Sequence, residues 1–379
     1  MTQCDVLIFV EDPGAANFVV DLPPKLEARR LSSSLIACGH AGPYLKSLGI
    51  EFHPVSAEQS ATQLLEALTP KLILCGTSEN PDTLGLQLIQ KAKKRGIPSI
   101  GIVDGPANAG ARFCGTGNSP LAFAPEWILA ADQSSKDNLI KLSFPSENIL
   151  ISGNPASDRI KSRFQELEAE GQVNVRKRLF PNLIPDQLLW VFMAEISDGL
   201  DQIDFLSSES YSMTGRGGSN KRTNIVLEEI LEAIKKLSPP PALVLRLHPK
   251  NTPEEFNDYT SEIFQISQGG LPDEVIYTAD LVIGMTSNAL FESAIMKRPT
   301  LSVAPREQEK EWLPAIGMGL VDFVYTRGQL VKYMTDFLSG MTTDHQSRIN
   351  EVVLFNASQR IAEMVSTVYA KTLSPEGRS

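Results

Sequence analysis

A cationic cluster in the second half of the chain has residue types that suit phosphate binding. Residues 244–250 read Val-Leu-Arg-Leu-His-Pro-Lys. The apolar start predicts a short buried strand, whose end carries Arg246, His248 and Lys250. Cationic side chains form charge-assisted hydrogen bonds to phosphate oxygens. Because ligands of open α/β sheets bind outside the carboxyl ends of the strands, we expect these three residues to contact a phosphate.

A second polar stretch follows further along the chain. Residues 280–284 predict another buried strand, and Thr286, Ser287 and Asn288 stand between this strand and a predicted helix. Free N–H groups and hydroxyls at a helix start can hold a diphosphate without a metal ion. The same residues also suit simple capping of the helix, and both roles can hold at once.

The ordered pair of motifs resembles the donor half of GT-B glycosyltransferases. Bacterial sialyltransferases, CDP-glycerol glycerophosphotransferases and the non-hydrolysing UDP-N-acetylglucosamine 2-epimerases carry similar His-Pro and Ser-rich turns in this order. The resemblance implies that His248 contacts the phosphate of a donor nucleotide and that Glu292 binds the hydroxyls of its ribose. A solvated helix glutamate is the alternative for Glu292. The resemblance covers the C-terminal half well and the N-terminal half loosely.

Carboxylates follow two predicted strands of the first half. Glu11 and Asp12 follow the strand at residues 5–10, and Asp104 follows a later strand. A carboxylate at a strand end can take the proton from an acceptor hydroxyl. The resemblance to sialyltransferases implies that Asp104 is the general base, although Val103 stands where that family has another acidic residue. Glu11 and Asp12 are the alternative bases, and turn formation or helix capping also accounts for the two aspartates.

The elements that must position these residues alternate between strand and helix, a pattern that predicts parallel, doubly wound α/β sheets. Apolar runs predict strands at residues 5–10, 35–38, 51–54, 72–75, 99–103, 127–130, 149–151, 188–193, 244–247, 280–283 and 300–303. The resemblance implies a GT-B fold, in which two Rossmann-like domains face each other across a cleft.

The expected domains are an acceptor domain at 1–157, a nucleotide-sugar domain at 158–344 and a C-terminal helix at 345–379. We expect that helix to cross back to the first domain. The junction is expected near Gly153-Asn154-Pro155, where an ordinary turn is the alternative. The polar stretch at 207–222 predicts a mobile lid or an insertion, because its composition gives it little to pack.

Composition narrows the choice of partners. The chain has 379 residues, enough for two domains, and a formal charge of −10. This charge argues against nucleic acid as the main partner and leaves membrane contact at most peripheral. The chain lacks an apolar run of the ~20 residues that a membrane span needs. Its cysteines lack metal-ligand spacing and suit free thiols in a reducing compartment, so we expect a cytoplasmic protein. They are Cys4, Cys38, Cys75 and Cys114.

These observations predict a metal-independent glycosyltransferase that uses a nucleotide-activated sugar in surface polysaccharide or glycolipid biosynthesis. The expected partners are a nucleotide sugar, as co-substrate rather than cofactor, and a glycan or glycolipid acceptor. One alternative is a sugar-nucleotide 2-epimerase, which needs several acid–base groups although the chain has 4 histidines. The other is a non-catalytic GT-B-like binding protein. A glycine-rich dinucleotide fingerprint and a P-loop are both absent from the sequence. The oligomeric state is left open.

Overall fold

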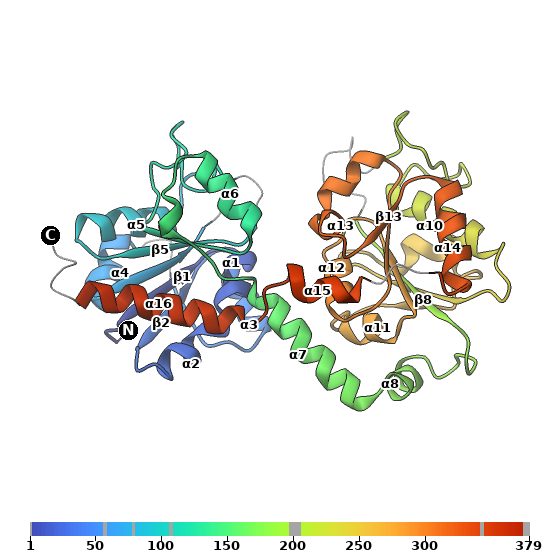
Figure 1. Ribbon diagram of the computed structural model, residues 1–379, viewed down its shortest axis with the longest axis horizontal. Helices are drawn as coiled ribbons and strands as arrows, with labels where there is room; N and C mark the ends of the chain where they lie inside the picture. The colour runs from blue at the N-terminus through green and yellow to red at the C-terminus, as the bar shows by residue number, and fades with distance from the viewer. Residues whose placement is uncertain are drawn as a thin grey trace. The chain divides into compact units, whose positions relative to one another are not determined.

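The computed structural model describes residues 2–55, 59–77, 80–105, 109–196, 206–341 and 345–373. The chain forms two compact units (Figure 1). Unit 1 comprises residues 1–158 and 354–379, and unit 2 comprises residues 159–353. Each unit is built on its own parallel sheet, so each has its own core and its own carboxyl edge of strands.

The sheet of unit 1 has seven strands in the order β3-β2-β1-β4-β5-β6-β7. The strands are β1 (Val6–Val10), β2 (Ser33–Ala37), β3 (His53–Pro54), β4 (Leu72–Gly76), β5 (Ser99–Val103), β6 (Trp127–Ala130) and β7 (Ile149–Ile151). The chain winds outward from β1 to one edge and then from β4 to the other edge. The topological switch point of unit 1 therefore lies between β1 and β4, whose carboxyl ends are candidate ligand sites.

Helices cover both faces of this sheet because its central strands are apolar on both sides. The helices are α1 (Pro13–Val19), α2 (Leu22–Glu27), α3 (Ala41–Ser47), α4 (Ala61–Leu68), α5 (Leu84–Lys94), α6 (Gln133–Lys141) and α16 (Ala357–Leu373), with a 3₁₀ turn η1 (Ser146–Asn148). Alternate residues of β1 join a core with α1, α2 and α16 on one face and a core with α4 and α5 on the other. Helix α7 (Pro155–Glu170) begins in unit 1 and continues into unit 2.

The sheet of unit 2 has six strands in the order β10-β9-β8-β11-β12-β13. The strands are β8 (Leu189–Met193), β9 (Ala242–Arg246), β10 (Gln265–Ser267), β11 (Leu281–Gly284), β12 (Thr300–Val303) and β13 (Asp322–Val324). Here the switch point lies between β8 and β11, with β9 on the other side of β8. The carboxyl ends of these three neighbouring strands therefore meet at the place where the polar motifs were predicted to meet.

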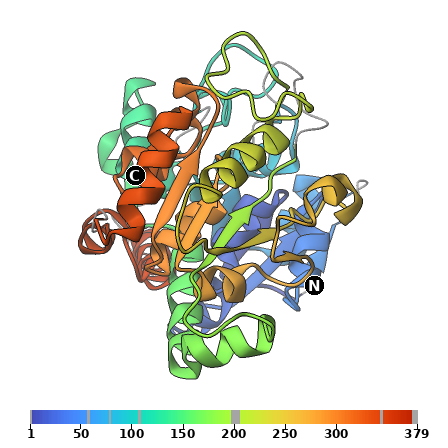
Figure 2. The ribbon, with the colours of Figure 1, turned by 90° about the vertical axis from the view of Figure 1, so that its right-hand side faces the viewer.

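Two helices of unit 2, α10 and α14, lie side by side over one face of its sheet (Figure 2). The elements of unit 2 are α8 (Gln172–Leu179), α10 (Arg222–Ile234), η2 (Pro253–Tyr259), α11 (Asp273–Thr278), α12 (Ala289–Ile295), η3 (Glu307–Trp312), α13 (Pro314–Gly317), α14 (Arg327–Leu338) and α15 (Gln346–Val352). Helix α12 packs against β11 and β12, and it carries the residues that follow the Thr-Ser turn.

The segment predicted as one C-terminal helix at 345–379 contains two helices that belong to different units. Helix α15 packs on α12 in unit 2, whereas α16 packs on α2 in unit 1. The chain breaks at Asn356, which has a left-handed backbone (φ 63°). Asp158 accepts hydrogen bonds from the N–H groups of Asn356 and Ser358. The carboxylate thus satisfies the first free N–H groups of α16, and a helix boundary forms that the apolar pattern did not reveal.

The polar stretch predicted as a mobile lid or an insertion is held by buried carboxylates of α10. Glu229 accepts the N–H of Gly215 at 2.9 Å, and Glu228 accepts the N–H of Arg216 at 2.5 Å. Both carboxylates are buried. On the other side of the loop, the hydroxyl of Ser212 donates to the carbonyl of Pro305 at 2.7 Å. Hydrogen bonds to charged groups thus hold part of this stretch, whose composition gives it little apolar packing.

Candidate functional site

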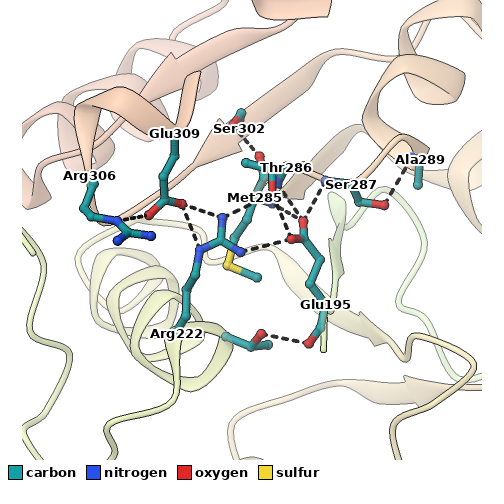
Figure 3. Close-up of polar contacts among 10 residues, drawn as sticks. Glu195, Arg222, Met285, Thr286, Ser287, Ala289, Ser302, Arg306 and Glu309 are labelled. Atoms are coloured by element: carbon teal, nitrogen blue, oxygen red, sulfur yellow. Dashed lines mark hydrogen bonds and ion pairs between the residues drawn. The ribbon is translucent and has the colours of Figure 1, made fainter. Parts of the chain in front are cut away.

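Three polar chain segments meet at the carboxyl ends of the central strands of unit 2, and Figure 3 shows two of them, at Glu195 and at Thr286–Ser287. Strand β8 is followed by Glu195, β9 by His248, and β11 by the Thr286–Ser287 turn. The three strands are hydrogen-bonded neighbours in the sheet. The structure therefore brings the two motifs of the sequence to one edge and adds an acidic residue between them.

The backbone N–H groups after β11 converge on the carboxylate of Glu195. Its Oε1 accepts hydrogen bonds from the N–H groups of Met285, Thr286 and Ser287, at 3.2, 2.6 and 2.7 Å. Its Oε2 accepts one from the hydroxyl of Thr286 at 3.1 Å. We call these three N–H groups and the Thr286 hydroxyl the β11 anion position. Successive N–H groups that point to one spot form an anion-binding concavity, and here the anion is a carboxylate of the protein itself.

A buried chain of charges supports Glu195. The guanidinium of Arg222 lies 3.0 Å from Glu195 Oε2 and donates from Nε to Glu309 Oε2 at 2.8 Å. Arg306 in turn donates to Glu309 Oε1 at 2.7 Å. The side chains of Arg222 and Glu309 are 0% exposed. Charges removed from water in this way are stable only when paired and hydrogen-bonded, so the chain of charges fixes both the arginine and the carboxylate.

Arg222 also links the β11 anion position to an aromatic ring. Its guanidinium donates to the hydroxyl of Thr286 at 3.2 Å and lies 5.6 Å from the ring centroid of Trp312. Arg306 lies 5.3 Å from the same ring. This cluster could not be predicted from the sequence, because its members come from α10, from the loop after β12 and from η3. Their types and positions follow no local spacing.

His248 follows β9 and belongs to this group. It is half-buried, and its Nδ1 accepts the N–H of Lys250 at 3.2 Å. In the neutral ring the proton therefore lies on Nε2. Burial and the charge of Lys250 lower the pKa of His248, and the nearby Glu195 opposes them. The N–H at Nε2 can donate a hydrogen bond to a phosphate oxygen, and this bond is charge-assisted because the acceptor is an anion.

The other two cations of the predicted cluster do not join the β11 anion position. Arg246 is buried and donates to Ser267 Oγ at 3.1 Å and to the carbonyl of Gly270 at 2.7 Å. Burial lowers the pKa of its guanidinium, and the charge of Asp273 opposes this. Arg246 thus orders the loop after β10. Lys250 is exposed at the rim.

Ser287, Asn288 and Glu292, at the start of α12, differ in their contacts and in their burial. Ser287 accepts the N–H of Ala289 on its hydroxyl at 3.2 Å, whereas Asn288 makes no side-chain cap. Glu292 is half-buried rather than solvated. Burial and the neighbouring charge of Asp273 raise the pKa of its carboxyl, while a hydrogen bond from Asn288 opposes the shift. Glu292 is therefore a carboxyl group that holds a proton more readily than a surface glutamate.

Unit 1 repeats the arrangement of unit 2 at its own switch point. Glu11 follows β1 and accepts the N–H of Leu84, the first residue of α5, at 3.1 Å. It also accepts a weak hydrogen bond from Cys38 Sγ at 3.3 Å. In both units a glutamate after the first strand thus binds the N–H groups that follow the neighbouring strand. Burial, the largest cause, raises the pKa of Glu11 although these hydrogen bonds oppose it.

Glu11 faces an open pocket in unit 1 with a volume of about 410 Å³. The pocket is lined by Glu11, Asp12, Cys38, Gly39, His40, Asn80, Pro81, Asp82 and Thr83. Asp12 precedes α1 without a side-chain cap hydrogen bond, so capping does not account for it. His40 lines the same pocket. A larger pocket of about 610 Å³ lies at the opposite edge, around Ser34 and His53, away from the predicted site residues.

Asp104 lies against the start of α1. Its Oδ1 is 2.8 Å from a guanidinium nitrogen of Arg112, which is buried and also donates to the carbonyl of Thr77 at 3.3 Å. A Cβ added at Gly14 would lie 2.3 Å from Asp104 Oδ2, so the close approach requires glycine there. The carboxylate is therefore fixed by an ion pair. Asn17 accepts a hydrogen bond from the hydroxyl of Tyr44.

Two further polar residues after predicted strands, Asn108 in the loop beyond Asp104 and Asp198 beyond the strand at 188–193, lie outside the described residues. Within the ranges that the structure describes, we find no group of three or more His, Cys, Asp or Glu side chains placed to bind a metal ion. Across the same ranges, none of the helices has the length and apolar character needed to cross a membrane.

Comparison with known proteins identifies the fold. Neither a family model nor a curated protein sequence matches the chain. A UDP-GlcNAc 2-epimerase from Neisseria meningitidis bound to UDP-GlcNAc superposes with a TM-score of 0.62 at 15% identity, covering 97% of this chain and 100% of that one. A putative UDP-N-acetylglucosamine 2-epimerase from Listeria monocytogenes gives 0.65 at 14% identity, with 97% of both chains covered.

The wall teichoic acid polymerase TagF is also similar in structure. It superposes with a TM-score of 0.56 at 14% identity and covers 98% of this chain and 90% of that one. The predicted α/β fold of the GT-B type, with two Rossmann-like domains, is confirmed by these matches along the whole chain.

Proposed function

We propose that this chain is an enzyme that acts on a nucleotide-activated sugar and holds the diphosphate at the β11 anion position of unit 2. The observation that carries the proposal is the convergence of the Met285, Thr286 and Ser287 N–H groups on one anion at the switch point. The same donors suit phosphate oxygens, and they stabilise the negative charge that develops when the sugar–phosphate bond breaks.

Within this class we propose epimerisation at C2 of a UDP-sugar as the reaction. The similar structures that are UDP-GlcNAc 2-epimerases support this choice. Epimerisation removes the C2 proton and returns a proton to the opposite face, so it needs groups that exchange protons near neutral pH. Glu11 in unit 1 and Glu292 in unit 2 are each a carboxyl group whose pKa is raised by burial, so each unit offers a candidate proton-exchanging group although the chain has 4 histidines.

The second candidate reaction is transfer of the sugar to a glycan or glycolipid acceptor, as the sequence first suggested. The structural similarity to a teichoic acid polymerase favours it, and Asp104, fixed by Arg112, is then the candidate base. Either reaction would supply sugars for surface polysaccharide or glycolipid assembly. We propose no resident cofactor for either, since the nucleotide sugar is itself a substrate.

Replacing His248 with alanine is expected to weaken the binding of UDP by about tenfold to 150-fold. The loss corresponds to one hydrogen bond to a charged group, about 1.5–3 kcal/mol, because the phosphate that accepts it is an anion. Calorimetric titration of UDP measures it. His53→Ala, at the exposed edge strand β3, is the matched control and should bind UDP like the parent chain. An affinity of His248→Ala within twofold of the parent would remove His248 from the site.

Turnover of the nucleotide sugar is expected to continue at an undiminished rate in EDTA. The sequence has no Asp-x-Asp triplet of the kind that holds a metal on a nucleotide sugar, and the N–H groups and hydroxyl that now contact Glu195 are the groups proposed for the phosphates. The rate after dialysis against EDTA, compared with the rate after adding Mg²⁺ or Mn²⁺, measures this. Activity lost in EDTA and restored by a divalent ion would show that the phosphates need a metal.

A further inference from the structure

We propose that Glu195 is an intramolecular competitor for the diphosphate: its carboxylate occupies the β11 anion position until a phosphate of the ligand replaces it. The inference rests on the proposed function. Every described donor at this position already contacts Glu195, namely three N–H groups, the Thr286 hydroxyl and the Arg222 guanidinium (Figure 3). One set of donors cannot hold a carboxylate and a phosphate at the same time, so the two anions exclude each other.

The charges around this position explain why it is never without an anion. Glu195 and Glu309 balance Arg222 and Arg306 in the buried chain of charges. If Glu195 left, the net charge of Arg222, Arg306 and Glu309 would be +1 instead of the present balance, and three N–H groups would lose their carboxylate. Both changes are costly away from water. Departure of Glu195 is therefore favourable only when another anion arrives, and this couples its position to ligand binding.

Replacement of the Glu195 carboxylate by a phosphate would preserve the environment of Arg222. A phosphate at the β11 anion position would face the same guanidinium, and the Arg222–Glu309 pair would stay in place. The ligand therefore meets an arginine that is already oriented and desolvated. The competitor lowers the affinity for the diphosphate, and it also keeps the binding groups in their bound arrangement before the ligand arrives.

Asp280 provides a matched comparison within the same sheet. Its Oδ2 accepts the N–H of Leu189 at 2.7 Å and its Oδ1 lies 2.7 Å from the guanidinium of Arg176. Like Glu195, Asp280 accepts a hydrogen bond from a backbone N–H and forms an ion pair with an arginine. Asp280 lies at the amino end of the strands, however, where ligands of open α/β sheets do not bind. Its loss should change stability without changing anion binding.

The test is calorimetric titration of UDP and of inorganic pyrophosphate into the parent chain, Glu195→Gln, Glu195→Asp and Asp280→Asn. Glutamine loses the charge, whereas aspartate keeps the charge but is one methylene shorter and does not reach the same N–H groups. Both Glu195 variants are expected to bind the two probes at least about tenfold more tightly, equivalent to freeing one charge-assisted hydrogen bond. Asp280→Asn is expected to bind them within twofold of the parent.

Each outcome decides between the two proposals. UDP bound equally or more weakly by both Glu195 variants than by the parent would overturn the competition while leaving the proposed function in place. If the Glu195 variants bind pyrophosphate more tightly than the parent does, but no chain binds UDP or any nucleotide sugar, the competition is supported and the proposed function is overturned. Binding of neither probe by any of the four chains would overturn both. Thermal unfolding of each variant establishes that it is folded, and Glu195→Asp serves alone if the glutamine variant is not.

Discussion

Glu309→Gln is expected to lower the free energy of unfolding of unit 2 by about 3–5 kcal/mol, the cost of breaking a buried ion pair by removing one partner. The carboxylate of Glu309 accepts hydrogen bonds from Arg222 and Arg306, and all three side chains are at most 5% exposed. Glutamine keeps the shape but not the charge, so the buried guanidiniums lose their shared anion. Urea unfolding followed by circular dichroism measures the change.

The neighbouring Glu307 gives the control for this prediction. It forms an ion pair with Lys310 in the same 3₁₀ helix, but both side chains are about half exposed. Exposed pairs contribute little, so Glu307→Gln should cost less than about 1 kcal/mol. Equal effects of the two substitutions would mean that the buried chain of charges does not stabilise unit 2 as its burial implies.

Glu11→Gln is expected to lower turnover of the nucleotide sugar by about 10²–10⁴-fold, the usual contribution of a general acid or base. The carboxyl group faces the pocket of unit 1, and its raised pKa favours proton exchange near neutral pH. Glutamine preserves the acceptor for the Leu84 N–H but cannot carry the proton. Steady-state rates of the purified variant measure the loss, and unchanged UDP affinity would show that binding is intact.

The pH dependence gives an independent check on Glu11. A general base works when ionised, so kcat/KM should rise with pH through the pKa of Glu11. Because burial raises that pKa, the rise should occur above the range of an ordinary glutamate. Asp12→Asn, in the same pocket, should keep this rise and lose less than tenfold in rate. If Asp12→Asn or Asp104→Asn loses the rise and Glu11→Gln keeps it, the base is the aspartate.

Much of the fold could be predicted because the central strands are continuous apolar runs that end in polar residues. Strands β10 and β13 were missed, since three residues such as Gln265–Ser267 carry too little pattern to detect. The break before α16 was missed because it depends on Asp158, a residue far away in sequence that caps the new helix. Tertiary hydrogen bonds decided both the helix boundary and the ordering of residues 206–221.

Part of the candidate site could be predicted because the ends of apolar strands are visible in the sequence. These strand ends located the Thr286–Ser287 turn and the His248 that follows β9. The sequence placed Glu195 only at a strand end, and it gave no reason to choose Arg222 or Glu309. Arg222 meets Glu309 across 87 residues of chain, and such a pairing follows from the packing of α10 against the loop after β12 rather than from any local pattern.

The most direct test is to incubate the protein with UDP-GlcNAc in D₂O without an acceptor and to record proton NMR spectra over time. We predict that the C2 epimer appears and that deuterium replaces the C2 proton, because inversion at C2 breaks the C–H bond. Release of UDP only when a glycan or glycolipid acceptor is added would instead favour transfer. Unchanged spectra for a full panel of nucleotide sugars, alone and with acceptors, would contradict the claim that this chain acts on a nucleotide-activated sugar.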